Sequence, residues 1–139
     1  MMILTIFQPV CVLALHTLIV LGALGMTRSY SVKNKKVSMR YYQEFLGDGE
    51  SGRLRLLSRN YINLLESPVL FYVAVVIIYM TNQVDDVYIY FCWGYVVCRI
   101  LHTLIHVFYN NVNIRFAMFG ASIFHLTMIW VRLSWNLFR

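Results

Sequence analysis

Hydrophobic residues fill four long stretches of the chain, and polar residues separate these stretches at three places. The first stretch, residues 1–27, contains no Asp, Glu, Lys or Arg. A helix needs about 20 mostly apolar residues to cross a bilayer. The pattern predicts membrane spans at about 5–27, 59–80, 87–109 and 114–137. We therefore expect an all-α, four-transmembrane-helix bundle that forms a single membrane domain over residues 1–139.

The composition excludes a soluble globular protein. Hydrophobic residues make up 60% of the 139 positions and charged residues 13%, whereas soluble domains average about 45–50% apolar and about 25% charged residues. A cleaved signal peptide would open with basic residues, but the first eight residues contain none. We expect the first stretch to remain as a membrane helix. We also expect Cys11, Cys92 and Cys98 to be buried free thiols rather than disulfides.

The net charge of +6 is concentrated around the first polar connection, residues 28–58. Eight of the twelve basic residues lie there or directly after it: Arg28, Lys33, Lys35, Lys36, Arg40, Arg53, Arg55 and Arg59. Cytoplasmic connections of membrane proteins carry an excess of Lys and Arg. This predicts that 28–58 is cytoplasmic and that both termini lie on the other side. Because these bases lie between two apolar spans, we do not expect nucleic-acid binding.

Polar residues of the third span share one helical face. Successive members are three or four positions apart: Cys92, Tyr95, Arg99, His102, His106 and Tyr109. Residues at those intervals lie on one side of a helix. If it faced lipid, Arg99 alone would cost about 2.5–3.5 kcal/mol on insertion scales. This face is therefore expected to contact protein or a water-filled site.

A second polar face belongs to the second span, where Arg59, Asn63 and Glu66 follow the same spacing. Glu66 is the only acid within any predicted span, and Arg99 is the base placed most deeply. We expect these two side chains to form an ion pair. With Arg115 at the start of the fourth span, the two faces predict a funnel that opens to the cytoplasm and attracts an anionic ligand.

Two other interpretations account for some of these residues. Polar side chains can join membrane helices without any further role, which is an alternative for the Glu66–Arg99 pair. His102 and His106, together with Glu66, have the residue types of a zinc or iron site. The guanidinium groups of Arg99 and Arg115 would repel a metal cation, so we do not expect one.

The combined motifs resemble a known family. Arg59-x-x-x-Asn63-x-x-Glu66, the nearby Pro68 and Arg99-x-x-His102-x-x-x-His106 are similar to the MAPEG superfamily, the membrane-associated proteins in eicosanoid and glutathione metabolism, and most similar to its bacterial branch. The resemblance implies a homotrimer that binds glutathione as a co-substrate between adjacent subunits. It implies that Arg115 is catalytic, stabilising the thiolate, and that the ligand is held by Arg59, Asn63, Glu66, Arg99, His102, His106 and Tyr109.

The function implied is a glutathione-dependent transferase or peroxidase that acts on apolar electrophiles or lipid hydroperoxides, in a bacterial inner membrane with its site open to the cytoplasm. The chain departs from the family pattern at His106 and Phe119, where tyrosine can occur, and at Phe116, where some members have a hydroxyl. These departures leave an alternative, a non-catalytic lipid-binding or scaffold membrane protein of the same fold.

Overall fold

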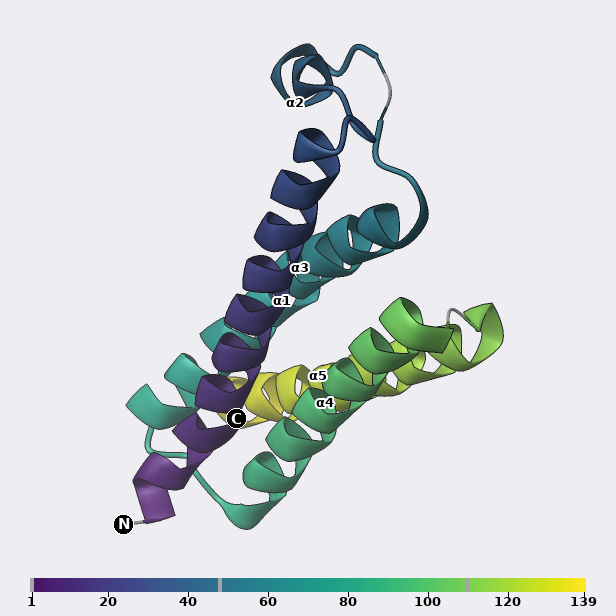
Figure 1. Cartoon of the computed structure of the whole chain (residues 1–139). Coiled ribbons are helices and arrows are strands. Elements are labelled where there is room, and N and C mark those ends of the chain that lie inside the picture. Colours follow the sequence, from purple (N-terminus) through teal and green to yellow (C-terminus); the bar gives the residue numbers. More distant parts are fainter. Residues whose placement is uncertain (1, 48, 110) are drawn as a thin grey trace.

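Long helices make up most of the chain (Figure 1). The structure, a computed structural model, describes residues 2–47, 49–109 and 111–139. A 3-10 turn, η1, and a π-helical turn, η2, directly adjoin α1 and α4. The elements are η1 Met2–Ile6, α1 Phe7–Lys33, α2 Met39–Glu44, α3 Gly52–Met80, α4 Asp86–Leu104, η2 Ile105–Tyr109 and α5 Val112–Phe138. The all-α fold expected from the sequence is confirmed.

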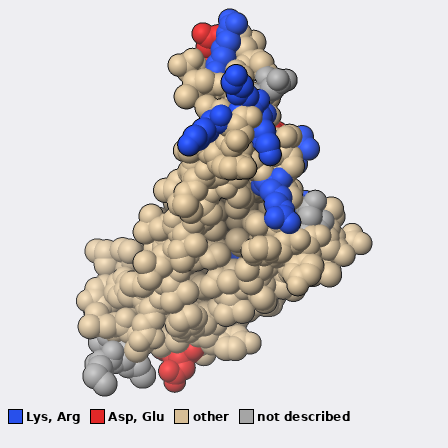
Figure 2. Space-filling view, in the orientation of Figure 1, with Lys and Arg blue, Asp and Glu red and all other residues tan. Residues whose placement is uncertain are grey.

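Four helical segments of the described chain are long and apolar enough to cross a membrane. They are Leu4–Lys33, Gly52–Met80, Asp86–Tyr109 and Val112–Phe138. A helix rises about 1.5 Å per residue, so the longest segment, with 30 residues, extends about 45 Å, more than the roughly 30 Å of a hydrocarbon core. Figure 2 shows the corresponding surface: Lys and Arg side chains gather at the α2 end, and the middle of this face is almost free of charge.

The polar connection 28–58 contains more helix than its charges indicated, because helices occupy both of its ends. α1 continues to Lys33, and α3 already begins at Gly52. The apolar side chains of this region explain the difference, since Leu54 of α3 packs with Leu24 of α1 and Val37 in a small cluster of their own. The charged residues cover the outside of this packed end.

A polar network closes the same end of the molecule. Arg28 donates from Nε to Glu50 Oε1 at 2.8 Å and from Nη2 to Ser58 Oγ at 3.2 Å. Tyr42 donates from its hydroxyl to the same Glu50 oxygen at 3.2 Å. Burial, and then the neighbouring Glu50 carboxylate, raise the pKa of the Tyr42 phenol. The network therefore joins α1, the connection and α3.

The main core lies between the long helices. α5 returns beside α4, and α1 packs on α3 (Figure 1). Phe71 of α3 stacks on Tyr95 of α4 with 4.7 Å between ring centroids. Leu13 of α1, Val75 of α3 and Ile129 of α5 are fully buried around this pair. Cys92 and Tyr95 belong to this core, and Arg99, His102 and His106 follow them toward the C-terminal end of α4 and into η2.

Candidate functional site

The polar face of α4 is buried within the chain. Cys92, Tyr95 and Arg99 have no exposed surface, and His102 and His106 are 4% and 3% exposed. The expectation that this face contacts protein is confirmed for these residues. Tyr109 is different, since it is 80% exposed. It ends the π-helical turn η2, whose wider turn breaks the three-and-four spacing that would have kept Tyr109 in line with His106.

The expected ion pair between Glu66 and Arg99 is not formed. Glu66 is exposed and makes no ion pair with another described residue. Arg99 Nη2 donates instead to the backbone carbonyl of Asn63. The reason is the orientation of α3, which turns Asn60 and Leu64 toward the bundle. Glu66 and Arg59 are thereby left on the exposed side of the helix, and Asn63 lies half-buried between the two sides.

Arg99 is a buried guanidinium with incomplete hydrogen bonding. Arg99 bonds Asn63 and also lies near an aromatic ring, since its Cζ is 5.7 Å from the centroid of the Phe119 ring on α5. Its Nε and Nη1 have no hydrogen-bond partner among the described residues. A buried donor without a partner costs about 1–3 kcal/mol, and more when it is charged. Two of the Arg99 guanidinium nitrogens therefore have no acceptor among the described residues.

Arg115, in the first turns of α5, contacts both histidines of the α4 face. Its backbone carbonyl lies 3.0 Å from His102 Nδ1, and its Nη1 lies 2.7 Å from His106 Nδ1. A carbonyl only accepts and a guanidinium only donates, so His102 donates from Nδ1 and His106 accepts at Nδ1. In the neutral rings, Nε2 is then an acceptor in His102 and a donor in His106.

The Nε2 atoms of both histidines are buried and have no hydrogen-bond partner among the described residues. Their rings are neighbours, with centroids 5.8 Å apart. Together with Arg99, the cluster presents unpaired donors at Arg99 and His106 and an unpaired acceptor at His102. A ligand that complements it needs an anionic acceptor and a hydrogen-bond donor.

A pocket of about 240 Å³ adjoins this cluster. It is lined by Asn63, His102, Val112, Arg115, Phe116 and Phe119. Three of the predicted site residues thus meet at one cavity, with two aromatic rings beside them. Small-molecule pockets commonly measure about 300–1,000 Å³, so the cavity within one chain holds only part of a larger ligand. Arg59, Glu66 and Tyr109 do not line it and lie on the exposed surface.

The sequence did not predict a series of buried polar side chains that joins α1, α3 and α4. Thr103 Oγ1 donates to Asn60 Oδ1 at 3.2 Å and lies 3.1 Å from His16 Nε2, which joins α4 to α3 and α1. Asn60 is fully buried, and its Nδ2 has no partner among the described residues. The burial of Asn60 could have been predicted from the sequence, because Asn60 is spaced on α3 so that it shares a helical face with the apolar residues Leu64 and Phe71. The charged and polar residues Arg59 and Asn63 instead favoured the neighbouring side of α3 as the site.

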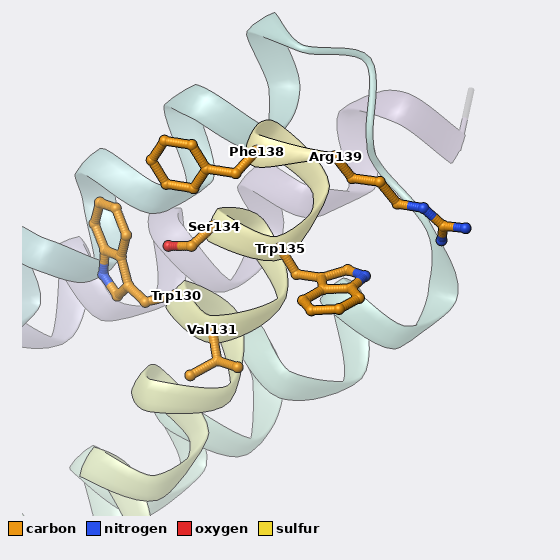
Figure 3. A pocket seen from close by; sticks show the side chains of 6 residues that line it. All are labelled: Trp130, Val131, Ser134, Trp135, Phe138 and Arg139. Carbon is orange, nitrogen blue, oxygen red and sulfur yellow. The ribbon is translucent and has the colours of Figure 1, made fainter.

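A larger hollow lies along the C-terminal part of α5 and is lined by Trp130, Val131, Ser134, Trp135, Phe138 and Arg139 (Figure 3). Its volume is about 790 Å³. The six residues come from the last turns of α5 and the position that follows it, and their polar side-chain groups are one hydroxyl, one guanidinium and two indole N–H groups. Nothing there matches the unpaired cation and histidines beside the smaller pocket. Among the described residues, no three His, Cys, Asp or Glu side chains gather closely enough to bind a metal ion.

Comparison with known proteins supports the motif resemblance over almost the entire length. Residues 6–135 match the MAPEG family. A search of curated proteins finds no match, and a search of solved structures finds none. The matched range includes the whole of α3, α4 and η2, most of the first and last apolar segments, and every residue that lines the smaller pocket. The chain is therefore an integral membrane protein that belongs to the MAPEG family.

Proposed function

We propose that this protein is a membrane-embedded, glutathione-dependent transferase or peroxidase that acts on apolar electrophiles or lipid hydroperoxides. The observation that carries the proposal is the buried, incompletely bonded guanidinium of Arg99. A buried charge is costly unless it is paired, and guanidinium groups bind carboxylates with strong, directional hydrogen bonds. Glutathione brings two carboxylates, an amine and a thiol, which also suit the unpaired atoms of His106 and His102.

Arg115 supports the chemical part of the proposal. It lines the pocket from the start of α5, close to His102 and His106. A cation beside a thiol favours its thiolate, which is the reactive nucleophile. In this role Arg115 would balance the charge on sulfur while the thiolate attacks an electrophilic carbon or a hydroperoxide oxygen. Phe116 and Phe119 give the same pocket an apolar wall for the second substrate.

The proposal includes a homotrimer with each site completed by a neighbouring subunit. Arg59 and Glu66 are exposed on α3, a helix that is apolar enough to span a membrane. Charged side chains facing lipid are costly, and a second copy covering this side of α3 would remove that cost. The same neighbour would enlarge the small cavity, so that Arg59, Glu66 and Tyr109 could reach the ligand. The basic α2 end favours a site open to the cytoplasm, and the resemblance of the motifs to the bacterial branch supports a bacterial inner membrane.

The test is glutathione binding and turnover by the detergent-purified protein. We expect glutathione to raise the melting temperature, since a ligand that binds only the folded state stabilises it by mass action. Arg99→Met should abolish this rise. Arg115→Ala should keep the rise but lower the rate of conjugation to a chlorinated dinitrobenzene about 10- to 100-fold, which is a loss of about 1.4–2.7 kcal/mol in transition-state stabilisation.

Arg139→Ala is the matched control, because it removes an arginine at the far end of α5, outside the smaller pocket. It should bind and turn over like the wild-type protein. Conjugation that persists unchanged in Arg115→Ala would remove Arg115 from the mechanism. A protein whose melting temperature does not respond to glutathione would contradict the proposed function itself.

A second function deserves a test because of the two phenylalanines in the pocket. Phe116 and Phe119 supply no hydroxyl, and the Phe119 ring lies against Arg99. An apolar wall around a cation also suits the carboxylate of a fatty acid, held without any reaction. In that case a long-chain fatty acid would raise the melting temperature and glutathione would not, and Phe119→Ala would reduce the effect of the fatty acid.

A further inference from the structure

The proposed transfer reaction needs a group that accepts the proton of the thiol, and Arg115 cannot be that group. A guanidinium has no acceptor atom and stays protonated at any pH at which the protein functions. It stabilises the thiolate after the proton has left. Since the pocket is small and partly lined by phenylalanine, a side chain is better placed than bulk water to take this proton. The inference below therefore rests on the proposed function.

His102 has the geometry of such an acceptor. Its Nδ1 donates to the backbone carbonyl of Arg115 at 3.0 Å, which fixes the ring and places the lone pair of the neutral form on Nε2. That Nε2 is buried and has no partner among the described residues. The side chain also lines the pocket. A histidine held at one nitrogen by a carbonyl and open at the other is a common arrangement for a general base.

The other polar residues nearby are less suited. His106 accepts from Arg115 Nη1 at 2.7 Å, so its remaining nitrogen carries a proton and acts as a donor. Glu66 is exposed and does not line the pocket. Asn63 has an amide, which is not a base. We propose that His102 is the general base of this site and removes the proton of the bound thiol through Nε2.

The step balances within the site. The S–H bond breaks, an N–H bond forms at His102 Nε2, and sulfur keeps the electron pair and bonds to the electrophilic carbon. The electron pair displaced from that carbon departs with its leaving group, and the imidazolium returns its proton to that group or to water. The charged and titratable groups around the ring are Arg99 of α4, His106 of η2 and Arg115 of α5, with neutral Asn63 on α3. The imidazolium forms only together with a thiolate, so the total charge of the cluster does not change.

His102→Asn is the decisive variant, since its amide N–H can still bond the Arg115 carbonyl while the base is lost. General-base catalysis contributes about 100- to 10,000-fold, so we expect kcat to fall at least about 100-fold at pH 7. The KM for glutathione should change only a few-fold. The residual rate should climb with pH as the bound thiol ionises without the base, and it should level off at or below the ordinary thiol pKa of about 8.5, because Arg115 still favours the thiolate. The ultraviolet absorbance of the thiolate, measured with glutathione alone, should be weaker in the variant at pH 7.

His125→Asn is the matched control. His125 also bonds a backbone carbonyl through Nδ1, that of Ala121 at 2.7 Å, but it lies on α5 outside the pocket. It should keep the wild-type kcat and pH profile. If His102→Asn does not fold, His102→Gln takes its place in the same measurements.

Three outcomes separate this inference from the function on which it rests. Wild-type activity combined with a low, pH-rescued kcat in His102→Asn supports both. Wild-type activity with an unchanged kcat and pH profile in the variant overturns the role of His102 and leaves the transferase standing. A wild-type protein that neither binds nor conjugates glutathione overturns the proposed function and this inference with it.

Discussion

At the scale of single residues, the contact between Gly94 and His125 sets the spacing of α4 and α5. A Cβ atom on Gly94 would overlap the imidazole ring of His125. The ring has little freedom to move away, because its Nδ1 bonds the Ala121 carbonyl at 2.7 Å and it makes a T-shaped contact with the Phe91 ring, with 6.0 Å between centroids. The absence of a side chain at Gly94 is therefore a packing requirement.

Gly94→Ala should destabilise the protein, because adding atoms to a packed interior costs about 1–3 kcal/mol. We expect a lower melting temperature in detergent. Gly120→Ala, on α5, is the control: a Cβ there meets no atom within 4 Å, and alanine favours helix over glycine by up to about 1 kcal/mol. Equal melting temperatures for the two variants would contradict this explanation.

At the scale of elements, Asp85 fixes the start of α4 and ties it to α5. Its Oδ1 accepts from the backbone N–H of Tyr88 at 2.9 Å, which caps the helix. The same oxygen accepts from Arg132 Nη1 at 3.0 Å, and Oδ2 accepts from Nη2. Arg132 also lies over the Tyr88 ring, 4.5 Å from its centroid. One carboxylate therefore serves both helices.

Asp85→Ala should lower the free energy of unfolding more than Arg132→Ala does. Loss of a helix N-cap costs about 0.5–2 kcal/mol, and only the aspartate variant loses it in addition to the ion pair. A double-mutant cycle on thermal unfolding would isolate the coupling between the two residues. Asp86→Ala, at the exposed neighbouring acid, should have little effect. A larger loss in Arg132→Ala would mean that the contact of Arg132 with the Tyr88 ring contributes more than the cap.

The apolar runs of the sequence are sufficient to predict the four long helices, since uninterrupted hydrophobic stretches leave few other structures in a membrane. They do not predict where the helices end. α3 begins at Gly52 because Leu54 and Ser58 pack against α1. A count of charges detects only the neighbouring arginines, Arg53, Arg55 and Arg59. The π-helical turn η2 is equally hidden, because the apolar pattern runs through it unchanged.

The candidate site was predictable on α4 and less so on α3. Three-and-four spacing placed Arg99, His102 and His106 on one face, and all three are buried. On α3 the same spacing fits both the 59-63-66 side and the side of Asn60. Packing against α1 and α4 decides which of these two sides of α3 faces the bundle. The spacing of residues along the sequence carries no information about that packing. The prediction of a Glu66–Arg99 ion pair was wrong for this reason.

At the scale of the whole molecule, the exposed side of α3 is the surface through which we expect copies of the chain to associate. Glu66 is the only acid of α3, and it lies on the surface together with Arg59 and apolar neighbours such as Val69 and Leu70. In the proposed trimer this side contacts another subunit. The basic α2 end (Figure 2) would then form a ring of positive charge around the entrance to the sites.

Chemical cross-linking in native membranes should give a ladder that ends at three chains. Glu66→Lys should shift this ladder toward the single chain, because it places a new cation among arginines in the proposed interface. Glu44→Lys makes the same change of charge on α2, outside the membrane spans, and should leave the ladder unchanged. A Glu66→Lys protein that still cross-links as three chains would move the interface to another surface.

Arg115 contacts His102 with its backbone and His106 with its side chain. Any amino acid at position 115 keeps the carbonyl, so the ring of His102 retains its orientation whatever the side chain is. Substitution there changes the local charge and removes the bond to His106, but it leaves the tautomer of His102 unchanged. The charge beside the thiol can therefore be changed at position 115 while the orientation of the proposed base, His102, is kept.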